Sequence, residues 1–139
     1  MQLVVDAANM PELMAWADCA VAAGGTTSLE LACMGLPSLV LVLADNQRDI
    51  AAKLQEIGAG RNLGWHAGVP ADAISMELSE LLLDRTARET MSQRGRELVD
   101  GLGARRVVRV LAHSGGLDER GSASRTGLSA AMQYEHRDH

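Results

Sequence analysis

The sequence feature that most constrains the fold is the apolar run from Ser38 to Leu43, which reads Ser-Leu-Val-Leu-Val-Leu. A continuous apolar run of this length is typical of a strand in a parallel sheet that helices cover on both faces. The run follows Gly35, Leu36 and Pro37, where glycine suits a left-handed helix cap and proline stops the helix just beyond it. The segment therefore predicts a helix that ends directly before a buried strand.

An earlier apolar segment, Cys19 to Ala22, predicts a second short buried strand. Between the two strands lies a helical pattern with Leu29, Ala32 and Cys33 on one stripe. A strand, a helix and a second strand in this order form a right-handed crossover, so both strands end at the same edge of a parallel sheet. The sequence thus predicts an α/β fold with a parallel sheet flanked by helices.

The loop between the first strand and its helix has the composition of a phosphate-binding turn. Gly24 and Gly25 allow a close approach of the backbone to a phosphate, and the helix that follows adds free N–H groups and a favourable dipole. Thr26 and Thr27 add hydroxyl donors. Glu30, one turn into the helix, could accept hydrogen bonds from a sugar diol.

A purely structural interpretation of this loop stays open. The two glycines also fit a tight turn, and Thr27 with Glu30 fits a capping box, in which each side chain bonds the other residue's N–H. The loop also lacks the G-x-G-x-x-G spacing of glycines that marks a dinucleotide-binding loop.

Polar residues follow the second strand as the glycines follow the first. Asn46 and Gln47 would bring amide groups to the same crevice at the strand ends. Alternatively, Asp45 or Asn46 caps the next helix, which runs from Gln47 to Ile57 and ends at Gly58. The apolar stripe of that helix consists of Ile50, Ala51, Leu54 and Ile57.

The flanking segments complete the predicted domain. Asn9 fits as the cap of a helix that ends at Trp16, with Leu13, Trp16 and Ala17 facing inward. Another short strand is expected at Gly60 to Leu63, and helices from Pro70 to about His113, with breaks at Asp84–Arg85 and Gly101–Gly103. Residues 114–139 are rich in Gly, Ser and charge, which predicts a poorly structured tail behind a domain of residues 1–113.

Composition limits the classes of function. The net charge of −5 and the absence of a dense Lys/Arg cluster argue against nucleic acid, and no apolar run reaches the roughly 20 residues of a membrane span. Cys19 and Cys33 lack CxxC spacing, which favours reduced thiols and a cytoplasmic location. His66 is the one candidate base in the domain, although a solvated loop histidine is the favoured interpretation of it. No catalytic residue, metal site or cofactor is expected.

Several motifs resemble, in order and spacing, the C-terminal half of a group of bacterial proteins. These proteins are the UDP-sugar hydrolases of the pseudaminic acid pathway and the SpsG-type spore coat polysaccharide proteins, within the GT-B superfamily that includes MurG. The resemblance covers about Leu3 to Leu111. The motifs that carry it are residues 9–18, 23–30, 34–38, 44–47, 62–64 and 100–107.

The resemblance implies a Rossmann-like domain, the C-terminal half of a GT-B fold, that binds UDP or a UDP-sugar. Its motifs assign the diphosphate to Gly24, Gly25, Thr26 and Thr27, and the ribose hydroxyls to Glu30. They imply that Asn46 and Gln47 face the sugar or a phosphate, and that the segment around Asn9 and Met10 lies near uracil. Such relatives often carry Ser in place of Thr26 and Trp in place of Leu29.

The sequence contains no counterpart of the N-terminal domain that carries the catalytic histidine in such hydrolases. We therefore expect a UDP-sugar-binding domain of a hydrolase or glycosyltransferase of surface polysaccharide or nonulosonic acid biosynthesis, with little turnover of its own. It could be one part of a longer enzyme or a donor-binding subunit that needs a partner chain. A generic α/β domain without a nucleotide site is the remaining alternative.

Overall fold

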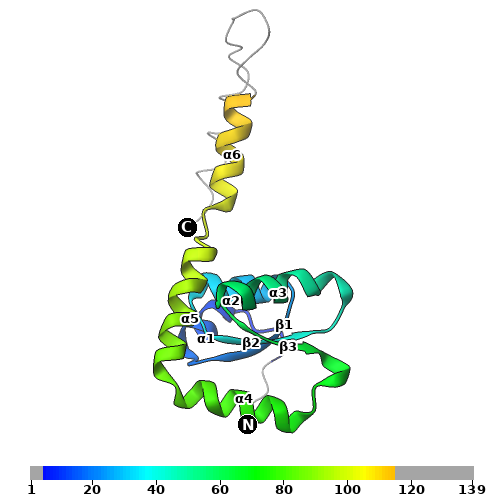
Figure 1. Ribbon diagram of the computed structural model, residues 1–139. Helices are drawn as coiled ribbons and strands as arrows, with labels where there is room; N and C mark the ends of the chain where they lie inside the picture. Colours follow the sequence, from blue (N-terminus) through cyan, green and yellow to red (C-terminus); the bar gives the residue numbers. More distant parts are fainter. Residues whose placement is uncertain (1–4, 115–139) are drawn as a thin grey trace, which may run out of the picture. The chain divides into compact units, whose positions relative to one another are not determined.

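The computed structural model describes residues 5–114 of the chain. It divides the chain into two compact units, Met1–Asp100 and Gly101–His139, and each is described here by itself. The first unit is built on a three-stranded parallel sheet in the order β1 (Ala20–Ala23), β2 (Ser38–Val42) and β3 (Arg61–Trp65) (Figure 1). The predicted α/β fold with a parallel sheet is confirmed.

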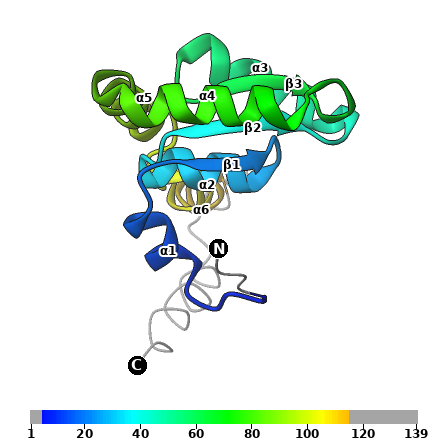
Figure 2. The same cartoon turned by 90° about the horizontal axis from the view of Figure 1, so that it is seen from below.

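Helices lie on both faces of this sheet. Figure 1 shows α2 (Thr26–Met34) and α3 (Arg48–Ile57) on one face and α4 (Ala71–Leu83) on the other. Figure 2, seen from below, shows α4 running along the sheet, and α5 (Arg85–Leu98), which follows α4, packs against α2. The first helix, α1 (Met10–Trp16), packs through Met14 against Leu31 and Leu36.

The central strand β2 is buried on both faces, as its apolar run predicts. Val40 and Val42 pack beneath α2 and α3 in a cluster with Ala32, Ala51, Leu54 and Ala59. Leu39 points to the other face, where it packs with Leu81 and Met91. Side chains that alternate between two covered faces explain why the whole run is apolar.

Two of the predicted burial patterns are wrong. Among residues 5–114, strand β1 pairs only with β2 and so lies at the edge of the described sheet, and its Val21 is 42% exposed. In α1 the buried residue is Met14, while Trp16 is 84% exposed. A seven-residue helix has only two turns, so the packing partner and not the periodicity decides which residues face inward.

The ends of α2 and α3 follow the predicted glycine signals. Gly35 (φ 69°) and Gly58 (φ 75°) hold the left-handed conformation at the two C-termini. Helix α5 contributes an arginine to each end, since the Arg96 guanidinium lies beside Gly35 and Arg94 donates to the Ile57 carbonyl at 3.1 Å. A cation at a helix C-terminus complements the helix dipole.

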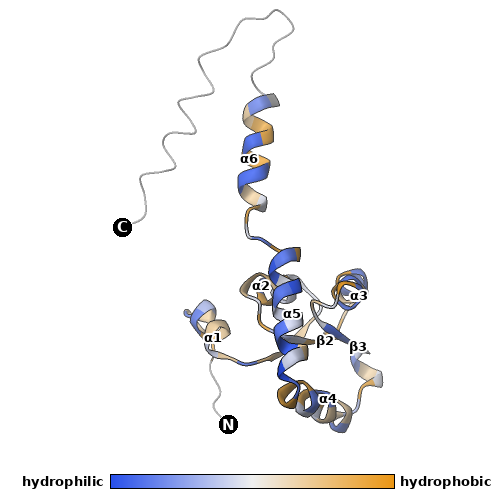
Figure 3. Ribbon diagram, turned by 60° about the vertical axis from the view of Figure 1, so that its left-hand side comes forward, coloured by the Kyte–Doolittle hydropathy of each residue, from blue (hydrophilic) through white to orange (hydrophobic). Residues whose placement is uncertain are grey.

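The second unit contributes one described helix, α6 (Gly103–Ser114). Its expected apolar stripe of Val107, Val108 and Leu111 is present, and Figure 3 shows apolar and polar bands alternating along the helix. These three residues are 59–65% exposed. The predicted domain limits, 1–113 and 114–139, stay a prediction; of the expected tail, only Ser114 lies within the described residues.

From residue 5 to residue 114, the structure contains no helix with the length and apolar character needed to cross a membrane.

Candidate functional site

The glycine loop joins β1 to α2 as the sequence predicts. Gly24 and Gly25 form a turn directly after Ala23, and Gly25 is the N-cap of α2. Ser28, which is completely buried, donates from its backbone N–H and its hydroxyl to the Gly25 carbonyl, at 3.1 and 2.6 Å. These two bonds fix the loop to the first turn of the helix.

The capping-box interpretation of Thr27 and Glu30 is wrong. Both residues lie inside α2 rather than at its cap, and both are exposed. Within residues 5–114, no side chain caps the N-terminus of this helix. The threonine hydroxyls and the first backbone N–H groups of α2 therefore have no side-chain partner, as an anion-binding helix terminus requires.

The two glycines differ in how closely the protein surrounds them. A β-carbon on Gly24 would lie 3.2 Å from the Gln47 carbonyl oxygen and 3.3 Å from side-chain atoms of Val40 and Ala51. A β-carbon on Gly25 would meet only the Gln47 side-chain nitrogen, at 3.9 Å. Gly24 is thus closely surrounded, while the surface beside Gly25 is open.

The end of β2 brings Gln47 to this loop. The Oε1 of Gln47 accepts from the Leu43 N–H at 2.9 Å, which leaves the Nε2 donor on the side of Gly25. The expected N-cap role of Asp45 or Asn46 is wrong, because Asp45 instead accepts from Arg48 Nε at 2.8 Å and Gln47 is the cap position of α3. Asn46 is exposed beside it in a 3₁₀ turn, η1 (Asp45–Gln47).

Asn9 and Met10 lie at the start of α1. Asn9 holds the N-cap position, but its side chain makes no capping bond, and Met10 is 44% exposed. Helix α1 contacts α2 through Met14 at Leu31, in the second half of α2 rather than at its glycine loop. The predicted place of these two residues near uracil stays a prediction.

Residues at the end of β3 complete this edge of the sheet; sequence reasoning singled out only His66, as a candidate base, and did not select Trp65 or Arg48. The Arg48 guanidinium carbon lies 4.7 Å from the centre of the Trp65 ring. The His66 ring centre lies 5.3 Å from that of Trp65, with the ring planes at 41°. Their position in the sequence could have indicated this place, since Trp65 and His66 follow a predicted strand just as the glycines and Gln47 follow theirs.

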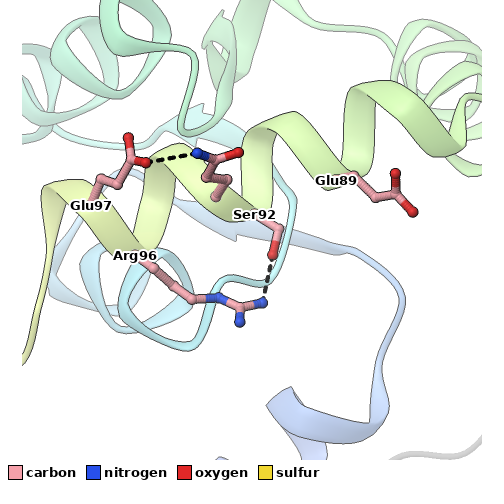
Figure 4. A pocket seen from close by; sticks show the side chains of 5 residues that line it. Glu89, Ser92, Arg96 and Glu97 are labelled. Carbon is pink, nitrogen blue, oxygen red and sulfur yellow. Dashed lines mark hydrogen bonds between the residues drawn. The ribbon is translucent and has the colours of Figure 1, made fainter.

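A surface hollow of about 420 Å³ lies along α5 and is lined by Glu89, Ser92, Gln93, Arg96 and Glu97, none of which is a predicted site residue (Figure 4). In it, Arg96 donates to Ser92 Oγ at 2.7 Å. This hollow lies near the C-terminus of α2, whereas the glycine loop precedes its N-terminus. Over the described part of the chain, no three His, Cys, Asp or Glu side chains group as metal ligands.

Taken together, the fold and the loop define a Rossmann-like α/β domain with a glycine turn at a helix N-terminus. The chain is 35% identical over 103 residues, 74% of its length, to the spore coat polysaccharide biosynthesis protein SpsG of Bacillus subtilis (strain 168). It is thus a relative of the SpsG-type proteins, as the resemblance predicted. The match spans 30% of the length of that relative. No family model matches the sequence.

Proposed function

We propose that this chain is the nucleotide-sugar-binding domain of a protein of polysaccharide biosynthesis, and that it binds UDP or a UDP-sugar at the carboxyl edge of its sheet. The observation that carries the proposal is the N-terminus of α2, which no side chain within residues 5–114 caps and which follows the open surface at Gly25. The relationship to SpsG supports the assignment to polysaccharide biosynthesis.

In this proposal the diphosphate lies on the loop of Gly24 and Gly25. Backbone N–H groups and the hydroxyls of Thr26 and Thr27 donate to its oxygens, and the helix dipole adds a favourable field. The Gln47 Nε2, oriented by the bond from Leu43 to its oxygen, donates to the phosphate or to the sugar.

Glu30 binds the ribose hydroxyls in the proposal. It is exposed one turn beyond the loop, and no hydrogen bond or ion pair within the described residues occupies its carboxylate. Asn9 and Met10 lie near uracil, and Asn46 lies on the sugar side.

Calorimetric titration of the purified chain with UDP, ADP and UMP tests this proposal. UDP is expected to bind more tightly than ADP, which carries another base, and than UMP, which lacks the second phosphate. Glu30→Gln should weaken UDP binding about tenfold, because a hydrogen bond to a charged group contributes on the order of 1.5–3 kcal/mol. Glu56→Gln, at an exposed carboxylate in α3, is the matched control. Absence of binding at millimolar nucleotide would refute the proposal.

The chain is expected to bind with little or no turnover, since the candidate base His66 lies beside Trp65 rather than at the glycine loop. Incubation with UDP-N-acetylglucosamine and detection of released UDP checks this point. Sustained release by the purified chain would show that the domain hydrolyses its ligand alone.

A second candidate function is that of a donor-binding part completed by another domain or chain. It is favoured by an apolar hollow of about 380 Å³ beside Leu29, the neighbour of Glu30, between α2, α3 and the end of α5. Its apolar lining includes Ile50, Leu54, Leu98 and Val99. The test adds, as a separate chain, the part of the Bacillus relative that lies outside the matched 30% of its length. The two chains are expected to co-elute, and Leu29→Asp should abolish the co-elution. Separate elution of the wild-type chain contradicts this function.

A further inference from the structure

The edge that carries the proposed diphosphate loop continues past Gln47 to an aromatic residue and a cation. We propose that Trp65 and Arg48 form a sugar-side subsite, which contacts the pyranose ring of a nucleotide sugar whose diphosphate lies at Gly24 and Gly25. This inference rests on the proposed function and adds to it the residues that recognise the sugar.

The first argument is the register of the sheet. Trp65 pairs with Val42, the last residue of β2, so it lies beside the start of the segment that leads to Gln47. Because neighbouring strands lie about 4.8 Å apart, the ends of β1 and β3 are separated by about 10 Å. A pyranose attached to a phosphate at the end of β1 can span that distance. Gln47, whose side chain reaches Gly25, is the direct neighbour of Arg48.

The second argument is a β-bulge that turns Trp65 toward this edge. Asn62 pairs with Val40 and Gly64 with Leu41, so Leu63 is an extra residue in β3. Gly64 holds φ 93°, and its N–H donates to the Asn62 side chain at 2.9 Å. A bulge of this kind re-aims the side chains that follow it.

The effect of the bulge is visible in the partners of Arg61 and Trp65. In a regular strand, residues four apart lie on the same face. Here Arg61 forms an ion pair with Glu77 of α4 at 2.7 Å, whereas Trp65 contacts Arg48 of α3, on the opposite face. If the same residues formed a regular strand without the bulge, Trp65 would lie on the same face as Arg61, toward α4, and the sheet would separate it from the glycine loop.

The third argument is the way in which Arg48 is held. Its guanidinium stacks on the Trp65 ring at 4.7 Å, and its Nε donates to Asp45 at 2.8 Å. These contacts leave the two terminal nitrogens as oriented donors, although 57% of the side chain is exposed. The guanidinium can therefore donate to oxygens of a sugar, while the exposed part of Trp65 packs on its C–H face.

The test compares UDP with UDP-N-acetylglucosamine, because only the second ligand reaches the subsite. Wild-type chain is expected to bind the nucleotide sugar more tightly than UDP. Trp65→Ala and Arg48→Ala should each lower the affinity for UDP-N-acetylglucosamine about tenfold and change the affinity for UDP less than twofold. Trp65→Phe should restore most of it, and Trp16→Ala, at the exposed tryptophan of α1, is the matched control. Thermal unfolding verifies that each variant is folded.

Fluorescence supplies a second measurement. In a Trp16→Phe chain, Trp65 is the remaining tryptophan. Its emission should change on addition of UDP-N-acetylglucosamine and stay nearly constant with UDP. Equal affinity of the wild type for both ligands, or an unchanged advantage in Trp65→Ala, overturns the subsite while UDP binding preserves the proposed function. Absence of binding by either ligand overturns both.

Discussion

Gly95 of α5 lies directly against the backbone of Ala32 in α2, so that a β-carbon on Gly95 would stand 2.8 Å from the Ala32 carbonyl oxygen. Both residues are buried, and the opposing atoms belong to a helix backbone that cannot rotate away. Glycine therefore sets the distance at which α5 crosses α2. The same crossing places Arg94 and Arg96 at the C-termini of α3 and α2.

Gly95→Ala is expected to destabilise the domain by about 1–3 kcal/mol, because separating the two helices outweighs a gain in helix propensity of about 1 kcal/mol. Urea unfolding followed by circular dichroism measures the change. Gly68→Ala is the control, since a β-carbon there has no neighbour within 4 Å. Equal stability of the two variants would show that α5 and α2 do not cross at this distance.

Gly64→Ala should cost about 1–2 kcal/mol through backbone strain, since φ 93° disfavours a β-carbon although the surrounding space is open. Gly64→Asn should cost less, because asparagine tolerates positive φ better than alanine. Thermal unfolding compares the variants. If alanine and asparagine lower the midpoint equally, strain at this position is not the cause.

Gly25→Ala separates ligand binding from folding. The residue has an ordinary φ of −96° and no close neighbour, so the substitution should cost less than about 1 kcal/mol of stability. UDP affinity should nevertheless fall about tenfold or more, because the methyl group occupies the surface proposed for the phosphate. The contrasting variant is Gly24→Ala, which should lower stability as well. Unchanged UDP affinity in Gly25→Ala would place the ligand elsewhere.

Cys19 should make stability depend on pH above neutrality. Burial raises the pKa of the Cys19 thiol, Asp18 adds to this effect, and Arg88 opposes it. The folded chain then retains a proton that the unfolded chain loses near its ordinary pKa of about 8.5, so stability falls as pH rises through this range.

Urea unfolding at pH 7 and pH 9.5 measures this dependence as a change in the free energy of unfolding. Two chains are compared: Cys33→Ser, which retains Cys19, and the double variant Cys33→Ser with Cys19→Ser. The chain that retains Cys19 should lose more stability at the higher pH. In the same Cys33→Ser chain, iodoacetamide should react with Cys19 more slowly in the folded state than in urea. A folded thiol that reacts as fast as the unfolded one contradicts the raised pKa.

Much of the fold was predictable because its signals are local. The run from Ser38 to Leu43 indicated the central strand, and Gly35 and Gly58 marked the ends of two helices. The glycine loop was predicted from its own residues, and Gln47 from its place after the second strand. The exposed Trp16 and the edge position of β1 were not predictable, because each depends on which elements pack beside it.

Local signals in the sequence were enough to locate the strands and helices approximately and to place Gly24, Gly25 and Gln47 at one edge of the sheet. Such features depend on residues a few positions apart, through periodicity, caps and the direction of crossover connections. The tertiary structure decided that Trp65 faces Arg48, through the pairing of β3 with β2, because the extra residue in β3 reverses the face on which each later residue of that strand lies. The same holds for Gly95 on Ala32, because contacts between residues distant in the chain arise from packing alone.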